Sequence, residues 1–181
     1  MDDIVKAALV KWPNVPHCHG WLALDARGDW YMRDDRCQAT GRFPQVKGSV
    51  IRHDKLREFI ARNYEADASG AWFFQNGPQR VYITLAAAPW VWRLQKLDQG
   101  GEGGALQVHS HTGRQAQVRG VWLDEAGRIF LDTDIGFGLV HTLDTALAAD
   151  AIETQAWPLR ELPFAQMPAR FGFRLNPADP P

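Results

Sequence analysis

Two histidine pairs are the residues of this 181-residue sequence with the clearest capacity for chemistry. His17 and His19 form one His-x-His pair, and His109 and His111 form the other. Residues two apart in an extended chain point the same way, so each pair presents two imidazole nitrogens that could bind zinc or iron. A metal-dependent enzyme that uses all four histidines is one hypothesis. The alternative is that they are solvated loop residues, because the sequence has neither a Cys-x-x-Cys pair nor a His-Glu-x-x-His motif.

A second group of residues could bind an anion. The segment from Gln75 to Arg80 is dense in hydrogen-bonding side chains, although a hairpin turn alone explains Asn76 and Gly77. The planar guanidinium group of arginine forms paired hydrogen bonds with a carboxylate or a phosphate. We expect four residues to anchor the charge of a ligand and two tryptophans to supply apolar contact area: Gln75, Arg80, Arg93 and Arg174, with Trp90 and Trp92.

Composition excludes several classes of protein. No stretch approaches the 18 consecutive apolar residues of a membrane span, and the acidic start Met1-Asp2-Asp3 is unlike a secretory signal. The pI of about 6.6 argues against nucleic acid as a partner. With only two cysteines, the sequence favours a cytoplasmic protein with reduced thiols. Its eight Trp, nine Phe and three Tyr residues are expected to build the core rather than to stack on bases.

A Gly-rich run at residues 98–105 resembles a linker. Residues 1–97 hold 14 basic and 10 acidic residues, a net charge of +4, whereas residues 98–181 hold 6 and 11, a net charge of −5. The opposite charges have two interpretations. Either the two halves attract each other, or the first half binds an anion.

Short matches between the halves indicate an internal duplication. The segment Leu24–Asp35 matches Leu123–Asp134, and both contain an Asp-x-x-Gly turn between apolar strands. Ala71-Trp72 matches Ala156-Trp157 farther along the chain. The runs at 90–94 and 171–175 share the pattern aromatic-x-aromatic-Arg-Leu. Four matches in the same order favour a copied unit.

The periodicity of each half predicts strands and one helix. In the first half, strands are expected at 21–24, 30–32, 71–74, 80–85 and 89–94. Apolar residues from Leu56 to Tyr64 recur at helical spacing. In the second half we expect a hairpin, a helix near 142–150, and strands around Trp157 and at 171–175.

Three runs carry a resemblance to known families. They are His19–Asp25, Phe73–Tyr82 and Ala88–Arg93, and they resemble a proteobacterial family of unknown function. The order hairpin, helix, hairpin and Ala-Pro-aromatic strand is similar to another uncharacterised bacterial family. That family's two-copy α+β structures imply a duplicated fold, and its link to signal transduction implies a signalling role. The resemblance implies no catalytic residue.

The sequence therefore predicts an α+β protein of two tandem related units, each a curved antiparallel sheet packed on one amphipathic helix. Their expected boundaries are 12–97 for the first unit, 98–105 for the linker, 106–175 for the second unit and 176–181 for the tail. The favoured function is non-catalytic binding of a small anionic ligand or a protein partner, with no cofactor assigned. A homodimeric interaction scaffold is a further alternative to the metal enzyme.

Overall fold

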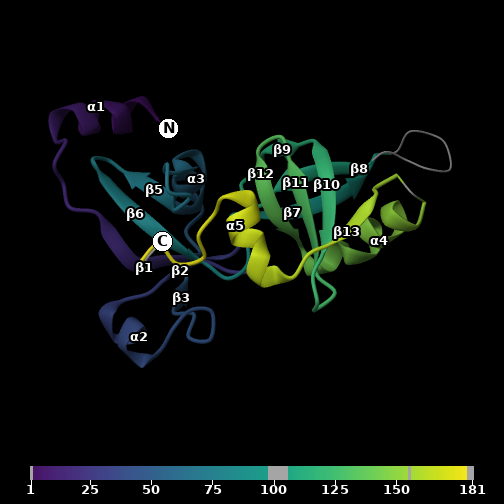
Figure 1. The fold of residues 1–181 in the computed structure, drawn as a ribbon. Coiled ribbons are helices and arrows are strands. Elements are labelled where there is room, and N and C mark those ends of the chain that lie inside the picture. The colour runs from purple at the N-terminus through teal and green to yellow at the C-terminus, as the bar shows by residue number, and fades with distance from the viewer. Residues whose placement is uncertain (1, 98–105, 155, 179–181) are drawn as a thin grey trace. The chain divides into compact units, whose positions relative to one another are not determined.

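The computed structural model describes residues 2–97, 106–154 and 156–178, which form two compact units (Figure 1). The first unit comprises Asp29–Ala86 with the N-terminal residues up to Asp25 and the C-terminal residues from Gly172. The second comprises Ala87–Phe171 and the short segment Ala26–Gly28. None of the described helices is both long and apolar enough to cross a membrane.

The first unit contains a six-stranded sheet in the order β3-β2-β1-β6-β5-β4. Its strands are β1 Cys18–Leu24, β2 Trp30–Met32, β3 Ser49–Val50, β4 Tyr64–Ala66, β5 Trp72–Asn76 and β6 Gln79–Leu85. Its helices are α1 Asp3–Lys11, α2 Asp35–Thr40 and α3 Asp54–Arg62. Neighbouring strands are antiparallel except β1 and β6, which run parallel, so two three-stranded meanders join through one parallel pair.

The second unit contains a seven-stranded sheet in the order β13-β10-β11-β12-β7-β8-β9. Its strands are β7 Trp90–Lys96, β8 Leu106–Ser110, β9 Gln115–Ala116, β10 Val118–Leu123, β11 Ile129–Thr133, β12 Gly136–Val140 and β13 Leu159–Glu161. Its helical segments are η1 Thr142–Asp144, α4 Thr145–Glu153, η2 Phe164–Gln166 and α5 Met167–Phe171. The pairs β7–β12 and β10–β13 are parallel, and the others are antiparallel.

The strands β7 to β12 follow the same order as β1 to β6, and β13 is an addition at one edge. By strand order, the hairpin β10–β11 of the second unit is equivalent to β4–β5 of the first. By the sequence matches, it is equivalent to β1–β2 instead. The connection between β4 and β5 is also an Asp-x-x-Gly turn, Asp67–Gly70, closed by a hydrogen bond from Gly70 N–H to Asp67 O. A duplication thus stays a hypothesis with two possible registers.

The α+β class with two curled, antiparallel-rich sheets is confirmed. Several predicted elements are present, including both Asp-x-x-Gly hairpins and the helix that begins after His53. The boundary between the units differs from the expected one, because β7 joins the second sheet and the central segment of the first unit therefore ends at Ala86. The predicted linker 98–105 lies outside the described residues, but β7 and β8, the strands on either side of it, are antiparallel neighbours in one sheet.

The prediction of a strand at 171–175 is wrong. Phe171 ends α5, and Gly172 has a positive φ of 66° that turns the chain. The next residues return to the first unit, where Leu85 N–H donates to Leu175 O and Arg174 N–H donates to Gly70 O. An aromatic-x-aromatic-Arg-Leu run therefore occurs once as a strand, at β7, and once as an irregular segment.

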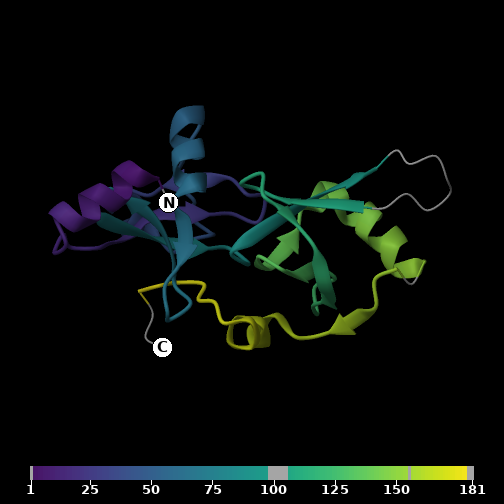
Figure 2. The same ribbon diagram turned by 90° about the horizontal axis from the view of Figure 1, so that it is seen from above.

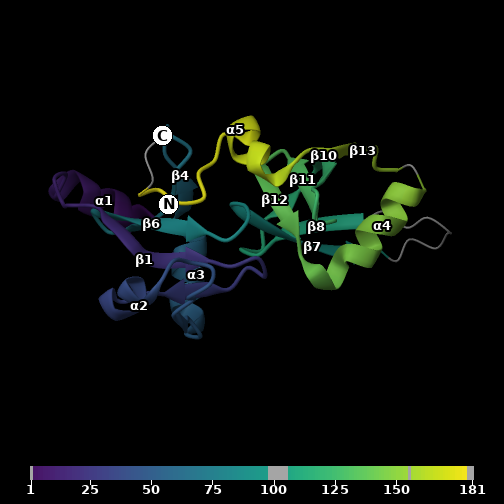
Figure 3. The ribbon, with the colours of Figure 1, turned by 60° about the horizontal axis from the view of Figure 1, so that its bottom comes forward.

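Aromatic rings fill the cores of both units. In the first unit, α3 lies on one side of the sheet, where Phe59 meets Phe74 edge-on at a centroid distance of 5.4 Å (Figure 2). Tyr64 packs against Trp72 and Trp30 on the same side. In the second unit the segment with η2 and α5 lies against β10–β12 (Figure 3). Its phenylalanines join an aromatic layer of Trp122, Phe130, Phe137, Phe164 and Phe171.

Two glycines of β12 make room for two tryptophans of β7. The indole Nε1 of Trp90 donates to Ile135 O at 3.0 Å, and that of Trp92 donates to Leu131 O at 3.3 Å. A Cβ at Gly136 would lie 2.8 Å from the Trp90 indole nitrogen. A Cβ at Gly138 would overlap both the Trp92 indole and the backbone of Trp90. The Gly-x-Gly run of the sequence is thus a packing feature.

Replacing Gly138 by Ala should destabilise the second unit by about 3 kcal/mol, the upper end of ordinary overpacking costs. The added methyl group meets the backbone of Trp90, which cannot move without breaking the parallel pair β7–β12. Thermal and urea unfolding measure the loss. Gly120→Ala in the same sheet is the control, because a Cβ there meets only side-chain atoms at 3.4 Å or more. Equal stability of the two variants would contradict this account.

Candidate functional site

The face of the first sheet away from α3 carries a row of polar and aromatic side chains. Phe73 lies opposite Tyr82 in the β5–β6 register, and Gln75 lies opposite Arg80. Directly opposed residues of an antiparallel pair point to the same face, so these four side chains share it. Gln75 is only 1 % exposed and its Nε2 donates to Gly77 O at 3.0 Å, which fixes the β5–β6 turn.

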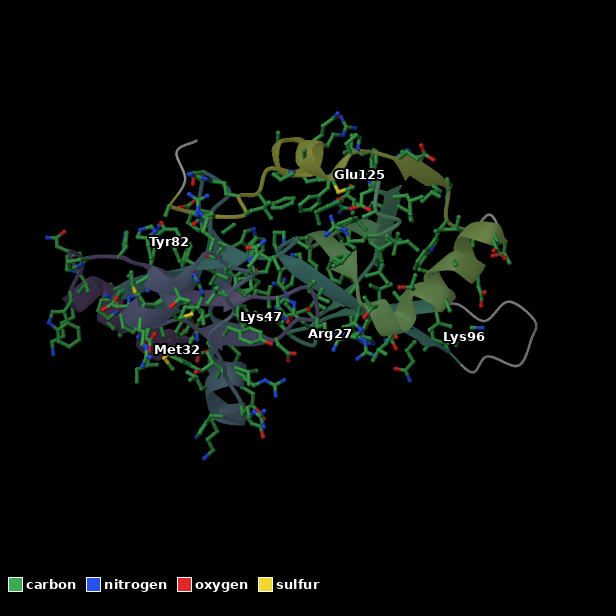
Figure 4. All side chains as sticks on the ribbon, turned by 90° about the horizontal axis from the view of Figure 1, so that it is seen from below. Arg27, Met32, Lys47, Tyr82, Lys96 and Glu125 are labelled. Atoms are coloured by element: carbon green, nitrogen blue, oxygen red, sulfur yellow. The ribbon has the colours of Figure 1, made fainter. Side chains whose placement is uncertain are left out.

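The rings of His17 and His19 contact the ring of Tyr82, and Figure 4 labels Tyr82. The His19 imidazole is stacked on it, with a centroid distance of 4.5 Å and an interplanar angle of 9°. The His17 ring meets it edge-on at 5.8 Å. Gln79 Nε2 donates to Pro16 O at 2.9 Å and so holds the segment that leads into β1 against β6. The predicted same-side placement of this His-x-His pair is correct.

Asp67 fixes the hydroxyl group of Tyr82. The Tyr82 hydroxyl donates to Asp67 Oδ2 at 2.9 Å, and Asp67 Oδ1 accepts from Ser69 N–H, Ser69 Oγ and Ala71 N–H. Burial alone would raise the pKa of Asp67, but the bonds from Ser69 and Tyr82 outweigh it and hold this pKa below its usual value. Burial raises the pKa of Tyr82. The pair therefore stays a neutral phenol bonded to a carboxylate near neutral pH.

Arg80 completes the group that we call the Tyr82 cluster: His17, His19, Asp67, Arg80 and Tyr82. Its guanidinium carbon lies 4.5 Å from the centre of the Phe73 ring. Among the residues that the structure describes, no carboxylate forms an ion pair with it. Burial, followed by the charge of His17, lowers the pKa of His19. Both histidines are exposed, so a ligand could reach the cationic side of the cluster.

Other residues of the predicted ligand set lie elsewhere. Trp90, Trp92 and Arg93 belong to the second unit, whereas Arg174 belongs to the first. Trp90 and Trp92 are 1 % and 0 % exposed, so neither ring offers a contact surface in this structure. Arg93 Nε donates to Asp144 Oδ2 at 2.6 Å. The predicted set of six residues is therefore divided between the units.

The four histidines form no metal site within the described residues. In the part of the chain that the structure describes, no group of three or more His, Cys, Asp or Glu side chains is placed to hold a metal ion. His111 packs against Trp90, and its Nδ1 accepts from Val91 N–H at 3.3 Å. Burial lowers the pKa of His111 to about 3. His109 lies opposite Arg93 in the sheet, and His17 and His19 are in the other unit.

Tyr82 and Asp67 are the functional candidates that the sequence reasoning missed. Tyr82 lies in the strand predicted at 80–85, whose rings are expected to build the core, and nothing in the sequence singles out Asp67. One signal was available, since Arg80 and Tyr82 are two residues apart in a strand and therefore share a face. Nothing in the spacing showed that β1 pairs with β6, which is what brings both histidines onto Tyr82.

Comparisons with known proteins show a family and a fold. The family model DUF2944, described as "Protein of unknown function (DUF2946)", matches residues 1–178. No curated protein matches. A DUF1285 family protein from Silicibacter pomeroyi DSS-3 is similar in structure, with a TM-score of 0.52 and 14% identity, covering 83% of this chain and 84% of that one.

A second DUF1285 family protein, from Shewanella baltica OS155, gives a TM-score of 0.47 and 13% identity, covering 72% of this chain and 91% of that one. The match to the DUF2944 model confirms the expected resemblance to a family of unknown function. The link to signal transduction stays a prediction.

Asp144→Asn should lower the free energy of unfolding by roughly 2 kcal/mol at pH 7, because charge-assisted hydrogen bonds are lost. Asp144 accepts from Arg93 and from Leu94 N–H, and although burial opposes them, these bonds keep its pKa below 3.8. A depressed folded pKa stabilises the protein above pH 4 and ceases to do so as the pH falls through the folded value. Urea unfolding of both proteins from pH 7 to pH 3 should therefore show the difference shrinking in acid.

Asp150→Asn is the matched control on α4. The Asp150 carboxylate lies 3.7 Å from Lys96 Nζ, and both side chains are exposed, so its loss should change stability little at any pH. A difference between Asp144→Asn and the native protein that stays constant down to pH 3 would contradict the role assigned to this carboxylate.

Proposed function

We infer that this chain, which belongs to the DUF2944 family of proteins of unknown function, is a non-catalytic module that binds a small anionic ligand at the Tyr82 cluster. The observation that carries the proposal is the guanidinium group of Arg80 without an ion pair among the described residues, beside two exposed imidazoles on the same face of the sheet. An arginine without an ion pair among the described residues, on the same sheet face as two exposed histidines, is suited to a carboxylate or a phosphate.

Rigid support favours binding at this site. Arg80 stacks on Phe73, His19 stacks on Tyr82, and the Tyr82 hydroxyl is fixed by Asp67. Groups that are already ordered lose less conformational entropy when a ligand binds, so the same contacts give a higher affinity.

The two acidic side chains of this face are hydrogen-bonded or buried. Asp67 accepts bonds from its own turn and from Tyr82, which leaves it poorly placed to act as a general base. Glu65 lies opposite Phe73 on the same row, and its Oε1 is buried without a hydrogen-bond partner among the described residues. Glu65 could accept from an N–H or O–H of the ligand. We therefore favour an anion that also carries such a donor.

Binding without turnover is what a sensor of a small molecule requires, so the proposal includes the signalling role implied by the resemblance. The homodimeric scaffold remains the rival. Sedimentation analysis over a range of protein concentrations separates the two, because a scaffold would change mass with concentration and would respond to no small anion.

Arg80→Ala should abolish the rise in melting temperature that a bound anion produces, while the melting temperature without ligand changes by no more than a few degrees. A ligand that binds only the native state raises its stability in proportion to the logarithm of occupancy. The measurement is a thermal-shift screen with inorganic phosphate, succinate, a nucleoside monophosphate and an acidic amino acid.

Arg57→Ala is the control, because it removes the same charge from exposed α3 on the other side of the sheet. If no anion stabilises the native protein, or if both variants lose the response equally, the Tyr82 cluster is not the binding site. A large loss of intrinsic stability in Arg80→Ala would show that the stack on Phe73 is structural.

Anion affinity should increase as the pH falls from 7.5 to 5.5. The low pKa of His19 keeps this imidazole neutral near pH 7 in the free protein, so proton uptake adds positive charge only as the pH falls through and below 6.5. Asp67 and Glu65 also face the row, but the pKa of Asp67 is lowered, so its charge is constant over this range. Calorimetric titration at three pH values measures the trend, and His19→Gln should flatten it.

A further inference from the structure

We propose a second anion site in the other unit, formed by Trp122, Arg160 and Arg170, which takes a small oxyanion such as a carboxylate or a phosphate. We call these three residues the Trp122 site. It is independent of the Tyr82 cluster, since all three residues belong to the second unit.

The register of the sheet places the members of this site together. Trp122 on β10 lies opposite Arg160 on β13, and two residues earlier Gly120 lies opposite Asp132 on β11. Residues two apart on one strand share a face, so Gly120 lies beside the Trp122 ring. From α5, Arg170 reaches the same ring.

The indole N–H of Trp122 is the group that points to a ligand. Trp122 is only 7 % exposed, and its Nε1 is buried with no acceptor among the described residues. Trp90 and Trp92, also buried in this unit, each donate to a backbone carbonyl. A buried donor without an acceptor is costly, which is why nearly all such groups in proteins are paired. An oxygen atom brought by a ligand would pair this one.

Two guanidinium groups surround the same indole. The Arg160 and Arg170 guanidinium carbons lie 5.4 and 5.6 Å from the centre of the Trp122 ring. Neither group forms an ion pair within the described part of the chain. Arg128 behaves differently, because it stacks on Phe164 and is also paired with Asp124 at 2.6 Å. The charge of Arg128 is balanced by that carboxylate, whereas Arg160 and Arg170 have no such ion pair among the described residues.

Gly120 has no side chain beside two of these donors. A Cβ at this position would lie 3.4 Å from Trp122 Nε1 and 3.5 Å from Arg160 Nη1, so both nitrogens border the space that a side chain would fill. Arg160 is exposed and can shift to admit an oxygen between its guanidinium and the indole. Three donors of this kind, two of them charged, suit an oxyanion.

Asp132 limits which oxyanions bind. Its Cβ lies 3.9 Å from the position that a Cβ would take at Gly120, so its side chain begins beside the same space. Like charges repel at this range, and a singly charged group is therefore preferred over a dianion. Asp132→Asn should consequently strengthen the binding of phosphate.

The test follows the indole N–H of Trp122 by ¹H–¹⁵N NMR, with its signal assigned by its loss in Trp122→Phe. Titration of the full chain with succinate or inorganic phosphate should move this signal, as a new hydrogen bond forms. Movement with succinate alone identifies a carboxylate site, and movement with phosphate alone a phosphate site. If neither anion moves the signal up to tens of millimolar, the proposal is overturned.

Variants separate this site from packing and from the Tyr82 cluster. Gly120→Ala should abolish the response, and Arg160→Gln should weaken binding at least tenfold. Arg119→Gln, which removes a charge from the neighbouring exposed position of β10, should leave it unchanged. Arg80→Ala should also leave it unchanged, so failure of one site does not imply failure of the other. If the native protein, Gly120→Ala and Arg160→Gln all respond equally, the assignment is overturned. If Gly120→Ala is unstable, the comparison of Arg160→Gln with the native protein still decides the test.

Discussion

The parallel pair at the centre of the second sheet depends on the absence of side chains on β12 where the tryptophans of β7 need the space. Gly138 faces Trp90 across the parallel pair, and Gly136 leaves room for the same indole. The two tryptophans then use their N–H groups to hold the backbone of β11 and of the β11–β12 turn. Because β7 is fixed in this way, Arg93 and Leu94 N–H reach Asp144 at the start of α4. One steric condition thus sets the position of two meanders and a helix.

The first sheet has the same strand order, but different contacts hold its central parallel pair. In its parallel pair, β1 and β6, the register shifts between Cys18 and Leu22, and this irregular start of β1 is where His17 and His19 come onto Tyr82. The geometry that joins the two meanders of this sheet is therefore also the geometry that assembles the Tyr82 cluster.

Local patterns sufficed to predict much of the fold. Asn76-Gly77 placed a hairpin, the spacing from Leu56 to Tyr64 placed α3, and Asp25-x-x-Gly28 placed the turn of another hairpin. What failed was non-local. β7 carries the same residue pattern as 171–175, but only β7 faces glycines across a parallel pair, and Phe171 instead ends a helix within the aromatic layer. The periodicity of a segment does not show which other strand or helix that segment packs against.

The residues of the candidate sites also divide into those that local sequence identifies and those that only the fold brings together. Arg80 could be chosen from its own neighbourhood in the sequence, but Tyr82 and Asp67 required the pairing of β1 with β6 and the fold of the Asp67–Gly70 turn. Arg93 was chosen on the same grounds as Arg80 and proved to be paired with Asp144, 51 residues later in the chain. Trp122, Arg160 and Arg170 are separated by up to 48 positions, and only the sheet register and α5 bring them together.

The addition of β13 affects how readily this chain can associate with other molecules through its sheet edges. A long unpaired strand edge is a template onto which another molecule can add a strand, and natural proteins avoid exposing one. The outermost strands here are β3, β4, β9 and β13, and each is two or three residues long as described. By lying along the six-residue β10, β13 replaces the longest edge that the second sheet would otherwise present. The thirteen strands of the described residues therefore offer little opportunity for aggregation through their sheet edges.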